Sequence, residues 1–213
     1  MSDQTVDTVA VPVDGVELEG ELTLPAGAIG LVVFAHGSGS SRHSPRNNFV
    51  AQVLRSHGLG TFLFDLLTET EDREYETRFD IDLLTERLLA VTEWLRGREE
   101  TRDLHIGYFG SSTGAAAALR AAATRGDDVD AVVSRGGRVD LATERLPEVT
   151  AATLLVVGGA DTAVLELNRA AQGALTCPNA LEVVDDAGHL FEGTGELEVV
   201  AELAADWFEQ ELS

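Results

Sequence analysis

The sequence predicts one α/β domain over residues 1–213, built on a doubly wound, mostly parallel sheet. Short apolar runs, typical of buried strands, alternate with longer segments of helical spacing, which is the pattern of parallel β-α units. The first two β-type runs are joined by Asp14-Gly15, a tight-turn signal that predicts an antiparallel hairpin at the N-terminal edge. A length of 213 residues and a hydrophobic content of 44% suit one domain with a sizeable core.

Apolar patterning and turn residues predict the individual elements in chain order. Strands are predicted at residues 5–13, 16–24, 29–35, 60–65, 104–110, 129–134, 153–157 and 180–184. Helices are predicted at residues 49–56, 81–96, 115–120, 139–146, 163–174 and 197–208. Asp80 and Gly97 suit the cap and the end of the second helix, and Pro147 suits the end of the fourth. The longest excursion, residues 66–79, is too short for a cap domain, so we expect a shallow, partly open cleft edged by this excursion and by residues 40–46.

The charge of the chain excludes several functions. The formal net charge is −22 and every one of the 15 basic residues is Arg. Without Lys there can be no Walker A loop, pyridoxal Schiff base or Ser-Lys dyad. The negative field argues against partners such as nucleic acid or an anionic membrane. The acidic residues are spread over many segments, which is typical of proteins kept in solution at high salt.

The remaining composition indicates a cytoplasmic, soluble protein with a small-molecule substrate. Cys177 is the one cysteine, so no intrachain disulfide can form, and we interpret it as a structural residue. Residues 1–7 are acidic and lack the basic flank and apolar run of a leader. No stretch is long and apolar enough to suggest a membrane span. We expect no cofactor and either a monomer or a homodimer.

The stretch Gly110-Ser111-Ser112-Thr113-Gly114 fits the pattern G-x-S-x-G of a nucleophile elbow. In that motif a strand turns sharply into a helix, so that one hydroxyl stands above the sheet edge and its backbone is strained. Glycines two positions before and after the serine leave room for the turn, because neither carries a Cβ. The alternative is an ordinary strand-to-helix turn in which Ser112 caps the helix.

The order Ser112, Asp161, His189 along the chain is that of the α/β-hydrolase triad. Asp161 and His189 each follow a predicted strand, so all three side chains are expected at the carboxyl edge of the sheet. A serine hydroxyl needs a base and the base needs an orienting acid. We therefore expect Ser112 Oγ within hydrogen-bonding reach of a His189 nitrogen.

The first Gly/Ser loop, which begins His36-Gly37-Ser38-Gly39, is the candidate oxyanion loop. The backbone N–H groups of Thr113 and Ser38 are the expected donors to a tetrahedral intermediate. A dinucleotide site is the alternative, but the third Gly of G-x-G-x-x-G is replaced by Arg42.

Four segments resemble the dienelactone hydrolase-related α/β-hydrolases with a serine nucleophile. They are His36-Gly-Ser-Gly-Ser40, Gly110-Ser-Ser-Thr-Gly114, Gly158-Gly-Ala-Asp161 and Ala187-Gly-His-Leu-Phe191. Residues 64–71 and 133–138 resemble one branch, whose members are sometimes fused to a phosphoribosyltransferase-like domain that we do not expect here. The resemblance implies the fold, Ser112 as nucleophile with Asp161 and His189 as partners, and hydrolase chemistry. Dienelactone hydrolases proper carry Cys at the position of Ser112.

Other polar residues have structural interpretations. We expect His36 to tie down its loop and Asp65 to hold the loop after its strand. His43, His57 and His105 show no metal-ligand spacing, so no metal site is predicted.

Four arginines are candidates for substrate binding, because they fall in two loops at the predicted active-site edge. They are Arg42, Arg46, Arg135 and Arg138. Arg forms bidentate hydrogen bonds to carboxylate or phosphate, so at least one of the four could hold an anionic group of the substrate. The alternative is that they neutralise residues 69–76 and Asp140.

These features together predict a serine hydrolase that cleaves a small ester or thioester through an acyl-serine intermediate. Two alternatives remain: a non-catalytic binding module on the same fold, and an acyltransferase that uses the same triad. A complete triad argues against the binding module, because a binding protein has no need of all three residues.

The acidic composition predicts that stability depends on salt. The screening length shrinks from about 30 Å at 0.01 M to about 3 Å at 1 M, so added salt should suppress repulsion among the 37 acidic residues. The melting temperature should rise markedly with KCl or NaCl, measured by calorimetry or circular dichroism. A melting temperature that stays flat from low to molar salt would remove the inference.

Overall fold

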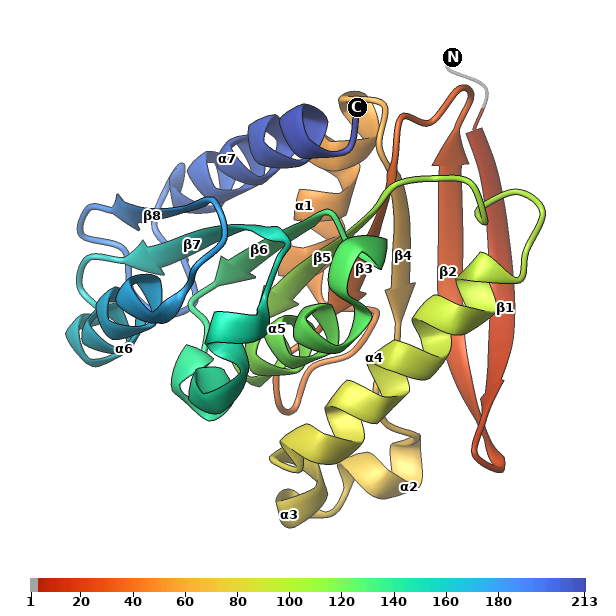
Figure 1. Cartoon of the computed structure of the whole chain (residues 1–213), viewed down its shortest axis with the longest axis horizontal. Helices are drawn as coiled ribbons and strands as arrows, with labels where there is room; N and C mark the ends of the chain where they lie inside the picture. The colour runs from red at the N-terminus through yellow and green to blue at the C-terminus, as the bar shows by residue number, and fades with distance from the viewer. Residues whose placement is uncertain (1–3) are drawn as a thin grey trace.

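An eight-stranded sheet, in the order β1-β2-β4-β3-β5-β6-β7-β8, forms the centre of the computed structural model, which describes residues 4–213 (Figure 1). Its strands are β1 (Gln4–Val13), β2 (Val16–Pro25), β3 (Leu31–Ala35), β4 (Gly60–Phe64), β5 (Ile106–Ser111), β6 (Ala131–Arg135), β7 (Ala152–Gly158) and β8 (Asn179–Val184). Strand β2 pairs antiparallel with β1 and β4, and the other pairings are parallel. The doubly wound sheet with an antiparallel N-terminal edge is therefore confirmed.

The hairpin between β1 and β2 turns where the sequence predicts it. Asp14 and Gly15 both have positive φ, 46° and 83°, as a two-residue primed turn requires. Along β2 the side chains of Leu18 and Leu22 are buried, whereas the glutamates between them face solvent. This edge of the sheet thus has one dry and one wet face.

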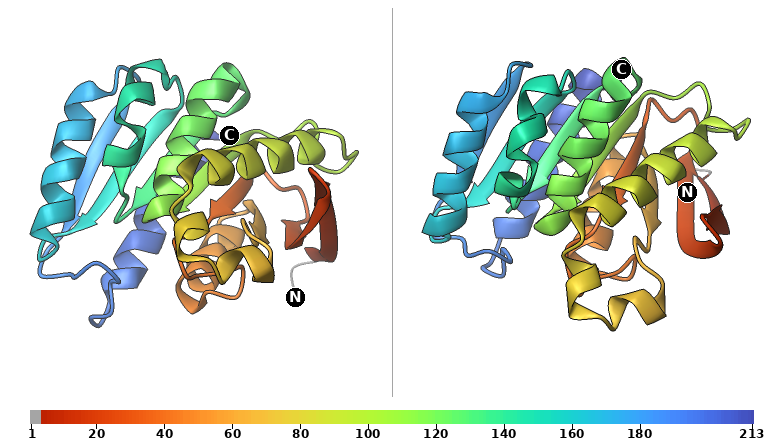
Figure 2. Two further views of the ribbon diagram at one scale, coloured as in Figure 1. Left: turned by 90° about the horizontal axis from the view of Figure 1, so that it is seen from below. Right: turned by 60° about the horizontal axis from the view of Figure 1, so that its bottom comes forward.

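Helices cover both faces of the sheet (Figure 2). The helices α1 (Pro45–Ser56) and α7 (Glu196–Glu211) pack on one face, around a core that includes Phe34, Phe109 and Phe208. The other face is covered by α4 (Ile81–Arg96), α5 (Thr113–Arg125), α6 (Thr162–Ala174) and the 3-10 segment η2 (Val139–Glu148). Parallel strands buried on both faces explain why the central runs of the sequence are continuously apolar.

Several boundaries differ from the sequence expectation for identifiable reasons. Helix α1 begins at Pro45, four residues early, because Ser44 accepts from the N–H of Asn47 and Pro is favoured in a first turn. The acidic excursion contains two short helices, α2 (Glu69–Asp72) and α3 (Tyr75–Arg78). Pro147 lies inside η2 instead of ending it, and a short 3-10 turn, η1 (Gly126–Asp128), follows α5.

The N-terminal expectation is only partly covered by the structure. The prediction that no leader is present rests on residues 1–7, of which residues 1–3 lie outside the described part. Within residues 4–213, no helix has the length and apolar character needed to cross a membrane.

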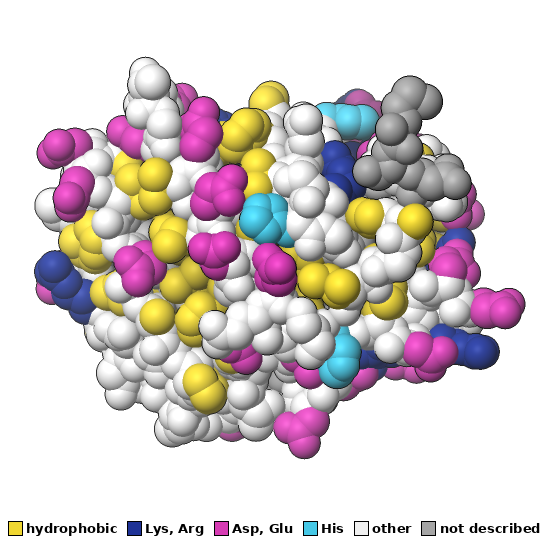
Figure 3. Space-filling view, turned by 90° about the horizontal axis from the view of Figure 1, so that it is seen from above, with side chains coloured by type: hydrophobic (Ala, Val, Ile, Leu, Met, Phe, Trp, Pro, Cys, Tyr) yellow, Lys and Arg dark blue, Asp and Glu magenta, His cyan; other side chains and the backbone are white. Residues whose placement is uncertain are grey.

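Acidic side chains are scattered over the surface, and the view in Figure 3 shows Asp and Glu spread across one face with few basic groups among them. Most arginines are paired with these acids. Arg98, for example, contacts Asp7 at 2.8 Å, and Arg96 contacts Asp128 at 2.8 Å. The surface charge is thus distributed and partly neutralised locally, not gathered into one patch.

Helix α5 approaches the carboxyl ends of β3 and β5 so closely that only glycine fits at two positions. A Cβ at Gly114 would lie 2.1 Å from the carbonyl oxygen of Ala35, and one at Gly110 would lie 2.5 Å from the Cα of Ala115. Both obstacles are backbone atoms, which cannot move aside by rotating a side chain. The two glycines of the predicted elbow therefore set the position of the helix.

The variant Gly114→Ala should lower the free energy of unfolding by about 3 kcal/mol or more, because the new methyl group overpacks against backbone. Gly173→Ala is the matched control. No atom lies within 4 Å of a Cβ at Gly173 in helix α6, so this change should raise the free energy of unfolding by about 0.5–1 kcal/mol. Denaturant unfolding in molar salt measures both, and equal midpoints for the two variants would contradict the packing argument.

Candidate active site

Ser112 stands at the turn between β5 and α5 in a strained backbone conformation. Its φ of 51° and ψ of −121° lie where residues with a side chain are rarely found. Its N–H donates to the carbonyl of Arg135 at 3.2 Å, and its carbonyl accepts from Arg138 at 3.0 Å and Ala115 at 3.1 Å. The Ser112 side chain makes no capping bond to the helix. The geometry is that of a nucleophile elbow and not of a serine helix cap.

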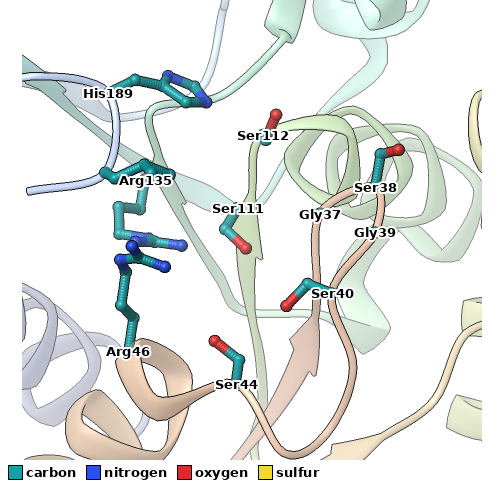
Figure 4. Close-up of a pocket in the computed structure, with 11 residues that line it drawn as sticks. Gly37, Ser38, Gly39, Ser40, Ser44, Arg46, Ser111, Ser112, Arg135 and His189 are labelled. Carbon is teal, nitrogen blue, oxygen red and sulfur yellow. The ribbon is translucent and has the colours of Figure 1, made fainter.

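His189 and Asp161 form an oriented pair beside Ser112. Asp161 follows β7 and His189 lies in the turn after β8. The Nδ1–H of His189 donates to Asp161 Oδ2 at 2.7 Å, which leaves Nε2 as the basic nitrogen. His189 and Ser112 line the same cavity, and Figure 4 shows the imidazole on the side of the cavity where Ser112 lies.

The expected hydrogen bond between Ser112 Oγ and His189 is not formed among the described residues. Catalytic contacts are often loose without substrate and tighten when it binds. Both side chains line one cavity. Rotation of the Ser112 side chain would therefore be the movement that forms its hydrogen bond to His189. The contact itself stays a prediction.

The oxyanion loop is arranged differently from the sequence expectation. The N–H of Ser38 is not open, because it donates to the side-chain oxygen of Thr113 at 2.9 Å. Thr113 is the first residue of α5, so its own N–H has no partner within the helix. A Cβ at Gly37 would lie 3.1 Å from Ser112 Cβ, so glycine allows the loop to approach the elbow. Thr113 N–H is thus an open donor, whereas an oxyanion would compete with the Thr113 hydroxyl for Ser38 N–H.

His36 is bonded as a structural residue. Its Nδ1–H donates to the carbonyl of Gly37 at 2.9 Å, and its Nε2 accepts from the N–H of Leu66 at 3.0 Å. The ring is buried, and burial lowers the pKa of His36 below its ordinary value. A neutral imidazole thus joins the loops that follow β3 and β4. Asp65 holds the loop after β3, because its carboxylate accepts a hydrogen bond from the backbone N–H of Arg42 at 2.7 Å.

The cavity at the elbow has a volume of about 350 Å³ and polar walls. Five serines from two segments, the loop between β3 and α1 and the end of β5, line it together with His189; they are Ser38, Ser40, Ser44, Ser111 and Ser112 (Figure 4). Among residues 4–213, Leu190 is the one lining residue with a large apolar side chain, although small-molecule pockets are mostly apolar. Residues 40–46 and 66–79 were expected to edge the cleft. Ser40, Ser44 and Arg46 do line the cavity, whereas no residue of 66–79 is among its lining residues. Ser111 ends β5 and was not expected to line it.

The four candidate arginines have different surroundings. Arg42 pairs with Asp65 and Glu19, and Arg138 forks onto Asp140 with bonds of 2.9 and 2.8 Å. The pairing of Arg138 with Asp140 is the one that the alternative interpretation predicts, whereas Arg42 pairs with acids outside residues 69–76. Neither Arg42 nor Arg138 is among the lining residues of the cavity. Arg46 and Arg135 instead line the cavity.

Arg46 contacts Glu192 at 3.0 Å at the edge of the cavity, where the Glu192 side chain is 70% exposed. Arg135 is buried, and its Nε and Nη1 have no hydrogen-bond partner within residues 4–213. The two guanidinium groups face each other in Figure 4. A pair of cations is therefore present beside the candidate nucleophile.

Cys177 is half-buried, and its Sγ–H donates to Thr153 Oγ1 at 3.7 Å. Burial raises the pKa of the Cys177 thiol, which makes the thiolate scarcer. In the described part of the chain no group of three or more His, Cys, Asp or Glu side chains is placed to hold a metal ion.

Known proteins resemble the whole of this chain. No protein-family model matches it. Two curated proteins of Mycobacterium tuberculosis, from strains CDC 1551 and H37Rv, bear the name phosphoribosyl transferase and are 55% identical over 208 residues. The match covers 98% of this chain and 46% of each relative, so the chain spans a little under half the length of these relatives.

Solved structures resemble it as well. The crystal structure of a dienelactone hydrolase from Anabaena variabilis is 50% identical, covers 99% of both chains and has a TM-score of 0.95. Est1E from Butyrivibrio proteoclasticus is 17% identical with a TM-score of 0.82, over 96% of this chain and 98% of its own. An alpha-beta serine hydrolase homologue from Coxiella burnetii is 21% identical with a TM-score of 0.80, over 94% and 96% of the two chains. The last two likenesses concern the fold alone.

The buried imidazole of His36 generates a prediction about pH. Its pKa is lowered in the folded chain, so below about pH 6.5 the unfolded chain binds more protons and stability is lost as the pH falls. The loss for this residue is at most about 1.4 kcal/mol per pH unit. His36→Gln, which keeps an acceptor but does not titrate, should show a shallower fall in the free energy of unfolding between pH 7.5 and 5.

His43→Gln is the control, because His43 is an exposed residue of the same loop. His57, whose pKa is raised mainly by its hydrogen bond to Glu209, is present in all three proteins. Its contribution to the pH dependence of stability therefore cancels in the comparison. Denaturant unfolding at several pH values measures the slopes. Identical slopes for wild type and His36→Gln would contradict the assignment of a neutral, buried imidazole.

Proposed function

This chain belongs to the dienelactone hydrolase-related α/β-hydrolases, and from that premise we propose that it hydrolyses a small ester or thioester through an acyl intermediate on Ser112. The observation that carries the proposal is the 2.7 Å hydrogen bond between His189 and Asp161. This oriented base lines the same cavity as the strained Ser112. The combination is the arrangement that a serine nucleophile requires.

Acylation follows from the roles of the three residues. Ser112 Oγ attacks the acyl carbon while His189 Nε2 takes the hydroxyl proton. Asp161 holds the imidazole in the required tautomer and stabilises its positive charge. The carbonyl oxygen becomes an oxyanion and accepts from Thr113 N–H, with Ser38 N–H or the Thr113 hydroxyl as the second donor. When the intermediate collapses, the leaving alkoxide or thiolate takes the proton from His189.

Deacylation repeats the chemistry with water. His189 takes a proton from a water molecule, whose oxygen attacks the acyl carbon, and Ser112 Oγ leaves and regains the proton. The products are a carboxylic acid and the free enzyme. The His189 side chain is 40% exposed, so water has direct access to the base, which favours hydrolysis over transfer of the acyl group.

The backbone of Ser112 argues for an enzyme rather than a binding module. A non-glycine residue in such a conformation costs on the order of 1–3 kcal/mol and is maintained where it serves a mechanism. A protein that only bound ligands on this fold would gain nothing from the strain. We assign the phosphoribosyl transferase name of the curated relatives to the part of those proteins that this chain does not span.

Labelling with a fluorophosphonate probe tests the proposal. The wild-type chain should be labelled at Ser112 and should hydrolyse p-nitrophenyl acetate. Ser112→Ala should abolish labelling and lower kcat by at least about 10³-fold, with a melting temperature close to that of the wild type. Asp161→Asn should keep the fold and lose most of the turnover, because the imidazole takes the wrong tautomer.

Ser56→Ala is the control, since Ser56 lies at the exposed end of α1 and bonds only the carbonyl of Val53. It should retain both labelling and turnover. A wild-type chain that resists the probe, or a Ser112→Ala chain that is still labelled, would refute the assignment of Ser112 as nucleophile.

A further inference from the structure

Arg135 differs from every other arginine of the described chain. All of the others except Arg55 form an ion pair with Asp or Glu within residues 4–213, and Arg55 donates to Thr61 Oγ1 at 3.0 Å. Arg135 makes no such contact, although it is only 9% exposed. In a chain of net charge −22, acidic partners are plentiful. A buried cation without one is unfavourable unless something else satisfies it.

The place of Arg135 shows where a partner would sit. The residue ends β6, opposite Ser111 in the register of the sheet, and its carbonyl accepts the N–H of Ser112. Its guanidinium lies in the cavity next to Ser111, on the opposite side from the oxyanion loop (Figure 4). A group bound there would be part of the same molecule whose acyl carbon meets Ser112.

Arg46 strengthens the positive field at this point. It lies in the first turn of α1, and its guanidinium faces that of Arg135 (Figure 4). Burial and the neighbouring charge of Arg46 lower the pKa of Arg135 to about 10, so Arg135 is still charged at neutral pH. The N-terminus of α1, a helix of 12 residues, adds its positive partial charge to the same cavity.

No carboxylate of the described chain lines the cavity to balance these charges. Within residues 4–213, its walls contain neither Asp nor Glu. Asp161 is engaged by His189, and Glu192 contacts Arg46 only at the exposed rim. The hydroxyls of Ser40, Ser44 and Ser111 complete the walls around the guanidinium groups. Such a cradle of cations and hydroxyls suits an oxyanion.

We propose that Arg135, assisted by Arg46 at the mouth of the cavity, binds a carboxylate or phosphate carried by the substrate beside its scissile ester. The natural substrate is then an anionic ester, and the subsite selects it by charge. This inference rests on the proposed function, because it names the substrate class of the same site. Arg135 binds the non-reacting part of the substrate, so its effect differs from that of an oxyanion-hole donor, which would act on every ester equally.

A matched pair of esters tests the subsite. Mono-p-nitrophenyl succinate carries a free carboxylate, and its methyl ester has the same acyl chain without the charge. Arg135→Gln should lower kcat/KM for the anionic ester by about 10–100-fold, mainly through KM, and change the neutral ester by less than about threefold. Arg135→Lys should fall between the two, because Lys keeps the charge but not the fork.

Arg138→Gln is the matched control. Arg138 lies three residues further along the chain, in the segment that follows β6, is held by Asp140 and is not among the lining residues of the cavity. It should leave the ratio of the two kcat/KM values unchanged. Inorganic phosphate and succinate, tested as inhibitors of the hydrolysis of the neutral ester, distinguish the two kinds of anion. The ion that inhibits the wild type but not Arg135→Gln identifies the group that the site prefers.

Stability separates binding from a scaffold role. Removal of an unpaired buried charge should leave the melting temperature of Arg135→Gln unchanged or raise it, whereas loss of a scaffold contact would lower it. A lowered melting temperature, or equal losses on both esters, would overturn the proposal. If Arg135→Gln does not fold, the proposal is likewise overturned unless Arg46→Gln, at a less buried position, shows the selective loss on the anionic ester.

Calorimetric titration with inorganic phosphate and with succinate needs no turnover, and so distinguishes failure of this inference from failure of the proposed function. Wild type should bind at least one of the two ions, with a Kd about tenfold or more lower than that of Arg135→Gln. Such binding without labelling of Ser112 would refute the hydrolase and keep the anion site. Labelling of Ser112 with equal binding by wild type and Arg135→Gln, or with no binding by either, would refute the anion site and keep the hydrolase.

Discussion

The backbone of Ser112 is the constraint on which the site depends. Three backbone hydrogen bonds, to Arg135, Arg138 and Ala115, hold it in a conformation that residues with side chains rarely adopt. The glycines at 110 and 114 let α5 begin directly beneath this turn. From that one position follow the exposure of the hydroxyl, the open N–H of Thr113 and the floor of the cavity. The strain is local, and the sheet and helix on either side supply the packing energy that maintains it.

The electrostatics of the chain have two parts that oppose each other. The outside is acidic, and nearly every arginine is used there to pair with a carboxylate. The inside of the cavity has the opposite sign, since among residues 4–213 its walls hold two guanidinium groups and no acid. Under the proposed anion site, the negative surface would repel an anionic substrate at long range and the two guanidinium groups would attract it at short range.

The sequence predicts the sheet well because its signals are local, and the same kind of local signal selects the candidate triad, whose Ser112–His189 contact stays a prediction. Apolar runs, the Asp14-Gly15 turn and G-x-S-x-G are each contained in a few neighbouring residues, and the topology then brings the strand ends together. The sequence pattern does not predict the beginning of α1, because residues 46–48 are polar and the signal there is the Ser44 cap followed by Pro45, not an apolar stripe. The bond from Ser38 to Thr113 and the lack of a partner for Arg135 could not be predicted. The first joins segments far apart in the sequence, and the second depends on which side chains the fold brings around Arg135, so no spacing in the sequence encodes either.

Arg135 takes part in the site twice, through its backbone and through its side chain. Its carbonyl accepts the N–H of Ser112 at 3.2 Å, and its guanidinium stands in the cavity. One residue therefore holds the backbone of the nucleophile through a hydrogen bond and carries the buried cation on its side chain. Under the proposed anion site, the reach of that side chain from Ser112 limits how many atoms can lie between the ester and the charge of a substrate. We therefore expect the rate of hydrolysis to depend on the length of the acyl chain.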